Sequence, residues 1–502
     1  MTEFDRQTPE PTLTARVARG AAWILGAGLV ARLLGAVNMI VVARLLVPED
    51  IGIVATATIV MQLMQGLSDI GVSQAVVKFR DASRDDLDTL FTLSVLRGLM
   101  IGLLLFAAAP FAAEFFGDPR FFWAFCGVAL FPAMLGFVNP RFYEFERDIN
   151  FTREFAVTFF NRLAGVATSI AIAVIFRTYW AIILGMLASA AVQVALSYAL
   201  RPHAPRLSFA SMGKVFGFSG WLAGVSFMAA LNNKLDVPIL TRAAGGAGAG
   251  VYFLGFQLSE LVAGQIATPM TRALYPGLSE MQGDPARMRL AFLKGVEALG
   301  ALAAPAAFGL GFVAADFTAV ILGEKWSGAA AVIAILAPVI GLQSLFYASQ
   351  AYAVALGLTR LVFFRELAFF LVRMPVFIWA AAVHGVMGAV YAAAGLGLFH
   401  VMLNLALYAR ASGAPFYEPL LAGRRPLGAV AAMAVWFLAI EPALGLFGTM
   451  APPARLAAGV ASGAIVYAGS LWALWRLEGR PDGAERRILE ILHGAARRLA
   501  AK

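Results

Sequence analysis

The sequence has too few charged residues for a water-soluble protein of its length. Only 14% of its 502 residues are charged, the mean hydropathy is +0.78, and 60% of the residues are apolar. A soluble domain carries about 25% charged residues, so the charges here cannot cover a water-facing surface of this size. Most of the outer surface must face lipid. We therefore predict a polytopic all-α membrane protein.

Several kinds of functional site are also missing from the sequence. The single cysteine, Cys126, excludes an intramolecular disulfide and a multi-cysteine metal site. There is no Walker sequence G-x-x-x-x-G-K-[ST], so the chain cannot hydrolyse ATP by itself. The histidines lack metal-ligand spacing, and no nucleophile and base arrangement predicts catalysis. We expect no enzyme activity, no cofactor and no metal.

One acidic string has the form of a motif of nucleotide-sugar enzymes but does not indicate such an enzyme. Asp86-Leu87-Asp88 has the D-x-D form of such enzymes, but it immediately precedes an apolar run. Aspartate at that place is typical of a helix cap.

Fourteen apolar runs are long enough to cross a bilayer, because a spanning helix needs about 20 mostly apolar residues. No small-residue cleavage site follows the first run, so we expect it to be retained. The predicted spans are 21–43, 51–76, 89–113, 121–138, 156–176, 179–200, 215–241, 248–275, 295–315, 329–357, 361–383, 385–409, 427–447 and 454–475.

Basic residues are distributed unevenly between the two sides of the membrane that these spans define. With both termini inside, cytoplasmic segments hold 26 of the 39 Lys and Arg residues and external loops hold six. Because Lys and Arg are retained on the cytoplasmic side, both termini are predicted to be cytoplasmic. The net charge of +9 then lies mainly against the cytoplasmic leaflet, so membrane lipids explain it and nucleic acid is not needed.

An internal repeat relates the two halves of the chain. An offset of 198 residues aligns Ala43-Arg44-Leu45 with Thr241-Arg242-Ala243, Gly52 with Gly250, and Gly66 with Gly264. In both copies a span ends in Arg, a short external turn follows and the next span opens with Gly. We predict external hinges at Arg44, Gly52, Arg242 and Gly250. Near-absent loops at 177–178 and 384–385 agree with the repeat, although Gly and Arg are also common near span ends.

The repeat predicts two pseudo-symmetric six-helix bundles plus two C-terminal helices, with both halves running in the same direction. The predicted parts are a cytoplasmic N-terminal tail (1–20), an N-lobe with spans one to six (21–200), a cytoplasmic linker (201–214), a C-lobe with spans seven to twelve (215–409), spans thirteen and fourteen (427–475), and a basic amphipathic cytoplasmic tail (476–502).

Ionisable side chains inside the predicted spans mark candidate functional residues. An ionised group at mid-membrane costs about 2.5 to 3.5 kcal/mol on insertion scales, so it faces a cavity or a partner. The predicted substrate cavity contains Arg32, Asn38, Arg162, Asn232, Asn233, Lys234 and Arg373. The acids predicted to couple an ion or to pair with these cations are Asp69, Asp236, Glu260 and Glu297. The cations Arg97, Arg272 and Arg365 lie near span ends, where long side chains snorkel to the interface.

Several strings resemble a known transporter family. Residues 43–52 (ARLLVPEDIG) and 67–72 (LSDIGV) are similar to the opening of the polysaccharide transporter family, which belongs to the multidrug/oligosaccharidyl-lipid/polysaccharide exporter superfamily. Residues 142–151 (FYEFERDINF), 274–279 (LYPGLS) and 323–326 (GEKW) also resemble that family. The resemblance covers spans one to twelve, and spans thirteen and fourteen agree by number only.

The resemblance implies a flippase of the bacterial inner membrane. Its substrate would be an isoprenoid-pyrophosphate-linked oligosaccharide, such as an O-antigen, capsule or exopolysaccharide unit, moved outward by alternating access. Cavity cations would bind the pyrophosphate, since Arg forms bidentate hydrogen bonds with its oxygens. Partners would be membrane lipids and the polysaccharide polymerase or export machinery.

Rival functions are open at this point. A small-molecule or drug exporter, or a peptidoglycan lipid-precursor flippase, would have the same superfamily fold. An acid-dominated cavity would favour the drug exporter, but seven basic and six acidic residues lie inside the predicted spans. A membrane polysaccharide polymerase or ligase would be expected to have a sizeable external loop, whereas the longest here is Asp316–Gly328.

Overall fold

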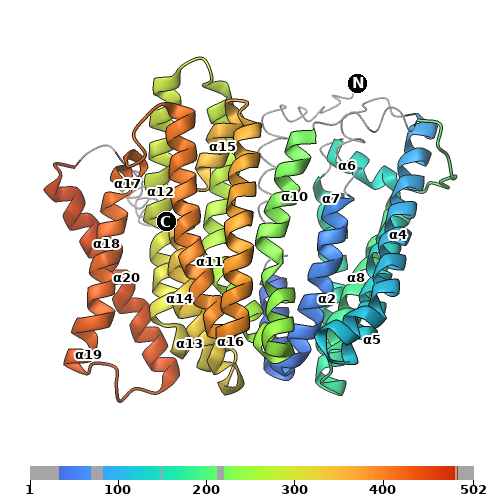
Figure 1. Ribbon diagram of the computed structural model, residues 1–502, viewed down its shortest axis with the longest axis horizontal. Helices are drawn as coiled ribbons and strands as arrows, with labels where there is room; N and C mark the ends of the chain where they lie inside the picture. The colour runs from blue at the N-terminus through green and yellow to red at the C-terminus, as the bar shows by residue number, and fades with distance from the viewer. Residues whose placement is uncertain (1–32, 69–82, 148–150, 212–219, 481–482, 484–502) are drawn as a thin grey trace, which may run out of the picture. The chain divides into compact units, whose positions relative to one another are not determined.

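The computed structural model describes residues 33–68, 83–147, 151–211, 220–480 and 483 (Figure 1). All regular secondary structure in these ranges is helical, with no strand among them. Eight of the described helices are long and apolar enough to cross a membrane, and two shorter apolar helices accompany them. The prediction of an all-α membrane protein is therefore confirmed.

The chain divides into two compact units, which we call unit 1 (Met1–Phe218) and unit 2 (Ser219–Lys502). Unit 1 contains a first helix at Leu33–Leu45 and then α2 (Pro48–Leu67), α4 (Arg84–Phe116), α5 (Arg120–Gly136), η1 (Pro140–Tyr143), α6 (Glu144–Arg147), α7 (Phe151–Phe176) and α8 (Trp180–Leu200).

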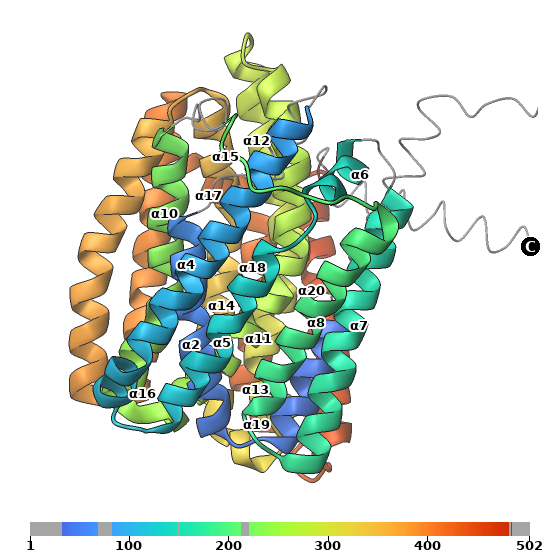
Figure 2. The same ribbon diagram turned by 90° about the vertical axis from the view of Figure 1, so that its right-hand side faces the viewer.

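Glycines let the helices of unit 1 pack closely in pairs. Helix α4 packs on α5, and α7 lies beside α8 (Figure 2). A Cβ atom added to Gly102 of α4 would lie 2.8 Å from the Ala129 carbonyl oxygen of α5. One added to Gly185 of α8 would lie 2.8 Å from the Gly165 carbonyl oxygen of α7. Small residues at such contacts are typical of membrane helix pairs, where van der Waals packing drives association.

The first turn of α4 explains the acidic string noted in the sequence. The Ser83 side chain accepts a hydrogen bond from the Asp86 N–H, and the Asp86 carboxylate accepts one from the Ser83 N–H. This reciprocal capping box satisfies two backbone donors that the helix leaves open. At the other end Gly117 adopts the left-handed conformation, with φ 73°, and ends the helix.

Unit 2 contains the remaining helices. They are α10 (Gly220–Lys234), α11 (Asp236–Glu280), α12 (Pro285–Phe312), α13 (Ala314–Ile321), η2 (Glu324–Trp326), α14 (Ser327–Leu345), α15 (Ala348–Ala355), α16 (Thr359–Ser412), α17 (Glu418–Ala422), α18 (Arg424–Val435), the π-helical η3 (Trp436–Ile440), α19 (Glu441–Leu444) and α20 (Pro452–Leu477).

Two of these elements are pairs of helices joined by a turn at one glycine. Gly245 (φ 75°, ψ 176°) divides α11, and Gly385 (φ 59°, ψ −141°) divides α16. Only glycine adopts these conformations readily. Both turns coincide with short external loops expected from the sequence, one between spans seven and eight and one between spans eleven and twelve.

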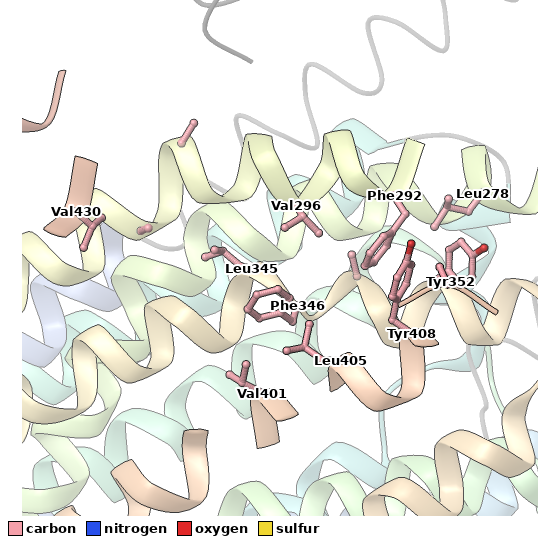
Figure 3. Close-up of a cluster of buried hydrophobic side chains, with 14 of the residues drawn as sticks. Leu278, Phe292, Val296, Leu345, Phe346, Tyr352, Val401, Leu405, Tyr408 and Val430 are labelled. Carbon is pink, nitrogen blue, oxygen red and sulfur yellow. The ribbon is translucent and has the colours of Figure 1, made fainter. Parts of the chain in front are cut away.

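The apolar core of unit 2 joins α11, α12, α14, α15, α16, α18 and α20 around an aromatic cluster (Figure 3). The Phe292 ring of α12 stacks on Tyr408 of α16 at 4.6 Å and meets Tyr352 of α15 edge-on at 5.4 Å. Leu278 of α11 and Val430 of α18 belong to the same buried cluster. Helices far apart in sequence are thereby fixed relative to one another, which positions the polar groups described next.

Candidate functional site

The first charged cluster of the site is centred on Asp236, where α11 begins. The Asp236 Oδ2 atom accepts hydrogen bonds from Arg373 Nη2 of α16 at 2.5 Å and from Tyr252 Oη of α11 at 2.8 Å. Asp236 and Arg373 are only 3% and 8% exposed, so the two charges neutralise each other away from water. Pro238, in the first turn of α11, has no N–H to donate to the Lys234 carbonyl, and α10 ends at Lys234.

The second cluster is built on the adjacent residues Arg365 and Glu366 of α16, both buried. Arg365 Nη2 lies 2.9 Å from Glu366 Oε1, and the Asn232 amide of α10 donates to Glu366 Oε2 at 2.9 Å. Arg365 also donates to polar side chains of α15 and of the second half of α16, namely Gln350 (2.9 Å), Asn404 (2.7 Å) and His400 (2.9 Å).

An aromatic pair connects the two clusters. The Arg373 guanidinium lies 5.5 Å from the ring centroid of Phe369, and Phe369 stacks on His400 at 4.5 Å. Glu366, Phe369 and Arg373 are spaced three and four residues apart, so they share one face of α16. We use the name ionic network for Asn232, Asp236, Tyr252, Arg365, Glu366, Phe369, Arg373 and His400. Its two acids balance its two arginines.

Some acceptor atoms of the ionic network remain available. Within the described ranges, Asn232 Oδ1 and Asp236 Oδ1 are buried and have no hydrogen-bond partner. The two residues are four positions apart, although a break between α10 and α11 lies between them. Buried polar atoms are usually paired, so this pair of oxygens can accept hydrogen bonds from water or from a bound molecule.

A separate buried ion pair joins the C-terminal helices to the rest of unit 2. Arg425 of α18 binds Glu297 of α12, and both side chains are buried. Nearby, the Tyr467 hydroxyl of α20 donates to the carbonyl oxygen of Ala301 at 3.1 Å. Glu297 therefore acts as a charge partner, one of the two roles that the sequence suggested for it.

In the described part of unit 1, buried ionic contacts lie near helix ends. Glu144, 5% exposed, accepts hydrogen bonds from Arg201 Nη1 and from Arg141 Nε (3.2 Å). The Arg201 guanidinium also lies 4.7 Å from the ring centroid of the fully buried Phe145. Glu144 and Phe145, which belong to the string that resembles the transporter family, thus connect α6 to the end of α8.

The segment after α8 is held along the first turns of α4. Asp88 accepts a hydrogen bond from the Arg206 N–H at 3.2 Å and lies 3.3 Å from the His203 ring. Thr92 accepts one from the Ser208 N–H at 2.9 Å, and Thr89 one from the Ser211 N–H at 3.3 Å. We use the name strap for residues 201–211. It covers most of the predicted linker (201–214).

The remaining predicted site residues lie in different surroundings. Arg32 and Asp69 are outside the described residues. Arg162, Asn233 and Glu260 are exposed, while Lys234 is partly buried and interacts electrostatically with Glu260. Asn38 Oδ1 is buried without a hydrogen-bond partner among the described residues. Of the predicted hinge residues, Gly52 and Gly250 are buried and Arg44 and Arg242 are exposed.

The sequence interpretation of Arg365 is wrong. It lies near the end of a predicted span, but it is 7% exposed and binds inward instead of snorkelling. The seven-residue spacing between Glu366 and Arg373 is a signal that places both on the network's face of the helix. Arg97 also binds within the protein, to the carbonyl oxygen of Gln65 (2.7 Å) and to Ser68 Oγ (3.1 Å) at the end of α2.

Outside the membrane-spanning segments, Glu418 of α17 has a shifted pKa. Burial raises the pKa of this carboxyl, but hydrogen bonds from Arg289 and Tyr408 outweigh it, and the pKa lies below its ordinary value. Arg289 Nε donates to the carboxylate at 2.8 Å and the Tyr408 hydroxyl donates at 2.7 Å. Among the described residues no group of three or more His, Cys, Asp or Glu side chains could hold a metal ion.

Sequence relatives of this chain belong to polysaccharide pathways. Lipopolysaccharide biosynthesis protein WzxC of Escherichia coli is 26% identical over 345 residues, which cover 66% of this chain and 68% of WzxC. Succinoglycan biosynthesis transport protein ExoT of Rhizobium meliloti is 25% identical over 468 residues, which cover 91% of this chain and 93% of ExoT.

Solved structures with the same fold are membrane transporters. Lipid II flippase MurJ, in an inward closed conformation, has a TM-score of 0.69 and 12% identity, covering 91% of this chain and 99% of MurJ. An inward-facing multidrug resistance MATE family transporter has a TM-score of 0.56 and 15% identity, covering 76% of this chain and 95% of the transporter. At sequence identities this low, the structural similarity establishes the fold alone.

A family profile identifies the chain directly. The profile described as "Polysaccharide biosynthesis protein" matches residues 41–331, more than half of the chain. With the relatives above, the match confirms the resemblance to polysaccharide transporters that the strings at 43–52 and 142–151 suggested. The chain belongs to the polysaccharide biosynthesis protein family.

Proposed function

We propose that this protein is a flippase that moves an oligosaccharide linked to an isoprenoid pyrophosphate from the cytoplasmic to the external leaflet of the bacterial inner membrane. The observation that carries the proposal is the family match over 41–331. The transport protein ExoT, aligned over 91% of the chain, supports the same function. The likeness to MurJ supports a transporter fold over nearly the whole chain.

The ionic network supports movement of unit 2 as one piece. Charges at membrane depth are tolerated when they pair or face water, and here two arginines of α16 pair with Glu366 and with Asp236 of α11, while Asn232 of α10 donates to Glu366. In our proposal these residues hold unit 2 together while the protein alternates between inward and outward access. Arg373 then stabilises Asp236 and does not bind substrate. Arg32 and Arg162 remain the proposed contacts for the pyrophosphate, while Lys234 interacts with Glu260.

We further propose fourteen spans, arranged as six plus six plus two, with both termini cytoplasmic. The described helices support this count, because α16 supplies spans eleven and twelve, and α11 supplies the end of span seven and all of span eight. After replacement of Cys126, single cysteines at the exposed positions Leu207 and Thr449 would report the two sides. An impermeant thiol reagent added to intact spheroplasts should label Thr449→Cys and leave Leu207→Cys unlabelled. The reverse result would contradict the topology.

The function is tested by removing the gene and by reconstituting the protein. A deletion strain should accumulate a lipid-linked oligosaccharide on the cytoplasmic side of the membrane. The purified protein in vesicles should move that lipid to the leaflet where an added glycosidase can reach it. Lipid II serves as the comparison substrate, because the fold is shared with MurJ. Transport of lipid II but not of the accumulated lipid would favour a peptidoglycan-precursor flippase, and transport of neither would contradict the proposal.

A further inference from the structure

The exposed side chains of most long helices are suited to lipid. On α4, for example, Leu99, Leu103 and Phe106 are 46%, 69% and 57% exposed. Such apolar surfaces need no water or partner within a bilayer. The exposed face of a membrane helix therefore indicates which medium it meets.

Helix α11 has a different exposed face after its turn at Gly245. Gln257, Glu260, Gln265 and Thr268 are exposed there, and Gly264 lies between them. We use the name polar stripe for these five residues. At 100° per residue they fall within one sector of the helix, which also holds the partly buried Leu261, while the buried Leu258 and Ala267 flank this sector and the buried Ser259 lies opposite it.

The polar stripe cannot face lipid. It runs over 257–268, about three helical turns and about 16 Å, through the middle of an apolar helix. A carboxylate and two amides exposed to hydrocarbon would lose their hydrogen bonds with water. The stripe therefore marks a side of unit 2 that meets water or another polar surface.

Gly264 leaves room for a ligand at the centre of the stripe. A Cβ atom added to this residue would meet only the Glu260 Cγ atom, at 3.9 Å. A flat molecule can therefore approach the helix backbone at this point, between the flanking polar side chains. Tyr347, 39% exposed, interacts electrostatically with Glu260 and adds an aromatic side chain near the same place.

The chemistry of the stripe is suited to sugar hydroxyls and unsuited to a pyrophosphate. The amides and the hydroxyl can both donate and accept hydrogen bonds with a glycan, and the carboxylate can accept them. The stripe has no basic residue, and Lys234, the nearby cation, is offset by its interaction with Glu260. A carboxylate at this position would repel the negative charges of the lipid's phosphates.

We propose that the polar stripe of α11 binds the glycan part of the lipid-linked oligosaccharide during transport, while the pyrophosphate is bound elsewhere. This assignment depends on the proposed flippase function. It separates sugar recognition from charge recognition, so variants of the stripe should change which glycan is transported more than whether the lipid anchor is bound.

Two glycine substitutions provide a matched test. Gly264→Leu places a side chain in the open space of the polar stripe. Gly395→Leu does the same on α16, where a Cβ atom also has open space but the exposed neighbours on its face are the apolar Leu398 and Met402. We expect Gly264→Leu to abolish transport of the accumulated lipid-linked oligosaccharide in vesicles and Gly395→Leu to retain it, with both proteins equally stable.

Binding measurements with two lipids distinguish the roles. The probes are the oligosaccharide-linked lipid extracted from the deletion strain and undecaprenyl pyrophosphate without sugars. The double variant Gln257→Ala, Glu260→Ala should bind the glycosylated lipid about ten-fold or more weakly, because each lost hydrogen bond lowers affinity several-fold. It should bind undecaprenyl pyrophosphate at least as tightly as the wild type does, because the loss of Glu260 removes the charge that offsets Lys234 and repels phosphate.

Other results of these experiments would contradict either the glycan assignment or the flippase function. Equal loss of both lipids in the double variant, or full transport by Gly264→Leu, would overturn the assignment of the stripe to the glycan. If the wild-type protein transports neither the accumulated lipid nor lipid II, the flippase function itself fails. That result is recognisable because it does not depend on any variant.

Discussion

The two units hold their helices together in different ways. In the described part of unit 1, the buried acids lie in the first two turns of helices, namely Asp50, Asp86, Asp88 and Glu144. The helix interiors pack through glycines such as Gly102 and Gly185. In unit 2, charged residues lie deep within the helices, as Glu297 and Arg373 do.

The two units thus differ in what holds their helices together within the membrane. Lipid offers little hydrophobic driving force between helices, so association depends on close packing and on polar contacts. Both units gain contact area at glycines, as at Gly341 in unit 2, where an added Cβ atom would lie 2.6 Å from the Ala307 Cβ atom, but unit 2 also depends on charges that must remain paired. A change of charge should therefore damage unit 2 more than unit 1, whereas a change of volume at a close glycine contact should damage either unit.

The largest effect is expected from breaking the pair between Asp236 and Arg373. Arg373→Leu leaves a buried carboxylate without its cation, which costs roughly 3 to 5 kcal/mol. The yield of monodisperse protein in mild detergent and its melting temperature should both fall sharply. Removing both charges, in Asp236→Leu with Arg373→Leu, should restore much of the loss, because no uncompensated charge remains.

The exposed Arg162 provides the control for this experiment. Arg162→Leu removes the same kind of charge but leaves no known partner buried, so the melting temperature should change little. A similar loss in both single variants would mean that pairing with Asp236 is not the reason for the effect.

A change of volume in unit 1 is expected to have the next largest effect. Gly185→Val places carbon atoms against the Gly165 carbonyl oxygen and Ser169, which lie 2.8 Å from the position of an added Cβ. Overpacking of this kind costs roughly 1 to 3 kcal/mol. Thermal unfolding in detergent measures it, with Gly395→Val, in open space, as the comparison. If the two variants have the same melting temperature, the close packing of α7 on α8 does not limit the stability of the protein.

Loosening the strap should have a smaller and more local effect. Asp88→Ala removes the acceptor of the Arg206 N–H, and an unsatisfied donor costs about 1 to 3 kcal/mol where water cannot replace the acceptor. Limited trypsin digestion should cleave sooner after Arg206, while the helices stay resistant. Asp85→Ala, at an exposed position in the same turn, is the control and should digest like the wild type.

The smallest expected effect depends on pH and concerns Glu418. Its pKa in the folded protein lies below the ordinary value of 4.5, so the carboxylate contributes stability above pH 4.5 and loses it as pH falls through the lowered pKa. Glu418→Gln should melt lower than the wild type at pH 7, by an amount equivalent to about 1 kcal/mol or less. The two melting curves should converge under acidic conditions. A gap that stays constant with pH would exclude this explanation.

The sequence predicted the helices well, because hydropathy alone decides which segments can enter a membrane. It also predicted the turns at Gly245 and Gly385, where apolar runs are interrupted by very short breaks. It predicted that Asp236 and Arg373 lie inside spans. That they pair with each other could not be predicted, since 137 residues separate them and several other ions of suitable sign were available.

Other parts of the site depend on tertiary contacts that have no local signal. Arg365 was assigned to the interface from its position near a span end, but the helix continues past the predicted boundary and α15 covers the side chain. The strap has no apolar periodicity, and its attachment to α4 depends on backbone N–H groups that meet Thr89 and Thr92. Short sequence motifs therefore do not predict these contacts.

The ion pair between Glu297 and Arg425 has a consequence for how related chains diverge. Arg425 belongs to the C-terminal helices, so a chain that ended after α16 would leave a carboxylate inside α12 without its cation. Relatives that lack those helices should therefore also lack the acid. In an alignment of relatives, we expect an uncharged residue at the position of Glu297 wherever the last two helices are missing, and covariation between the two positions wherever they are present.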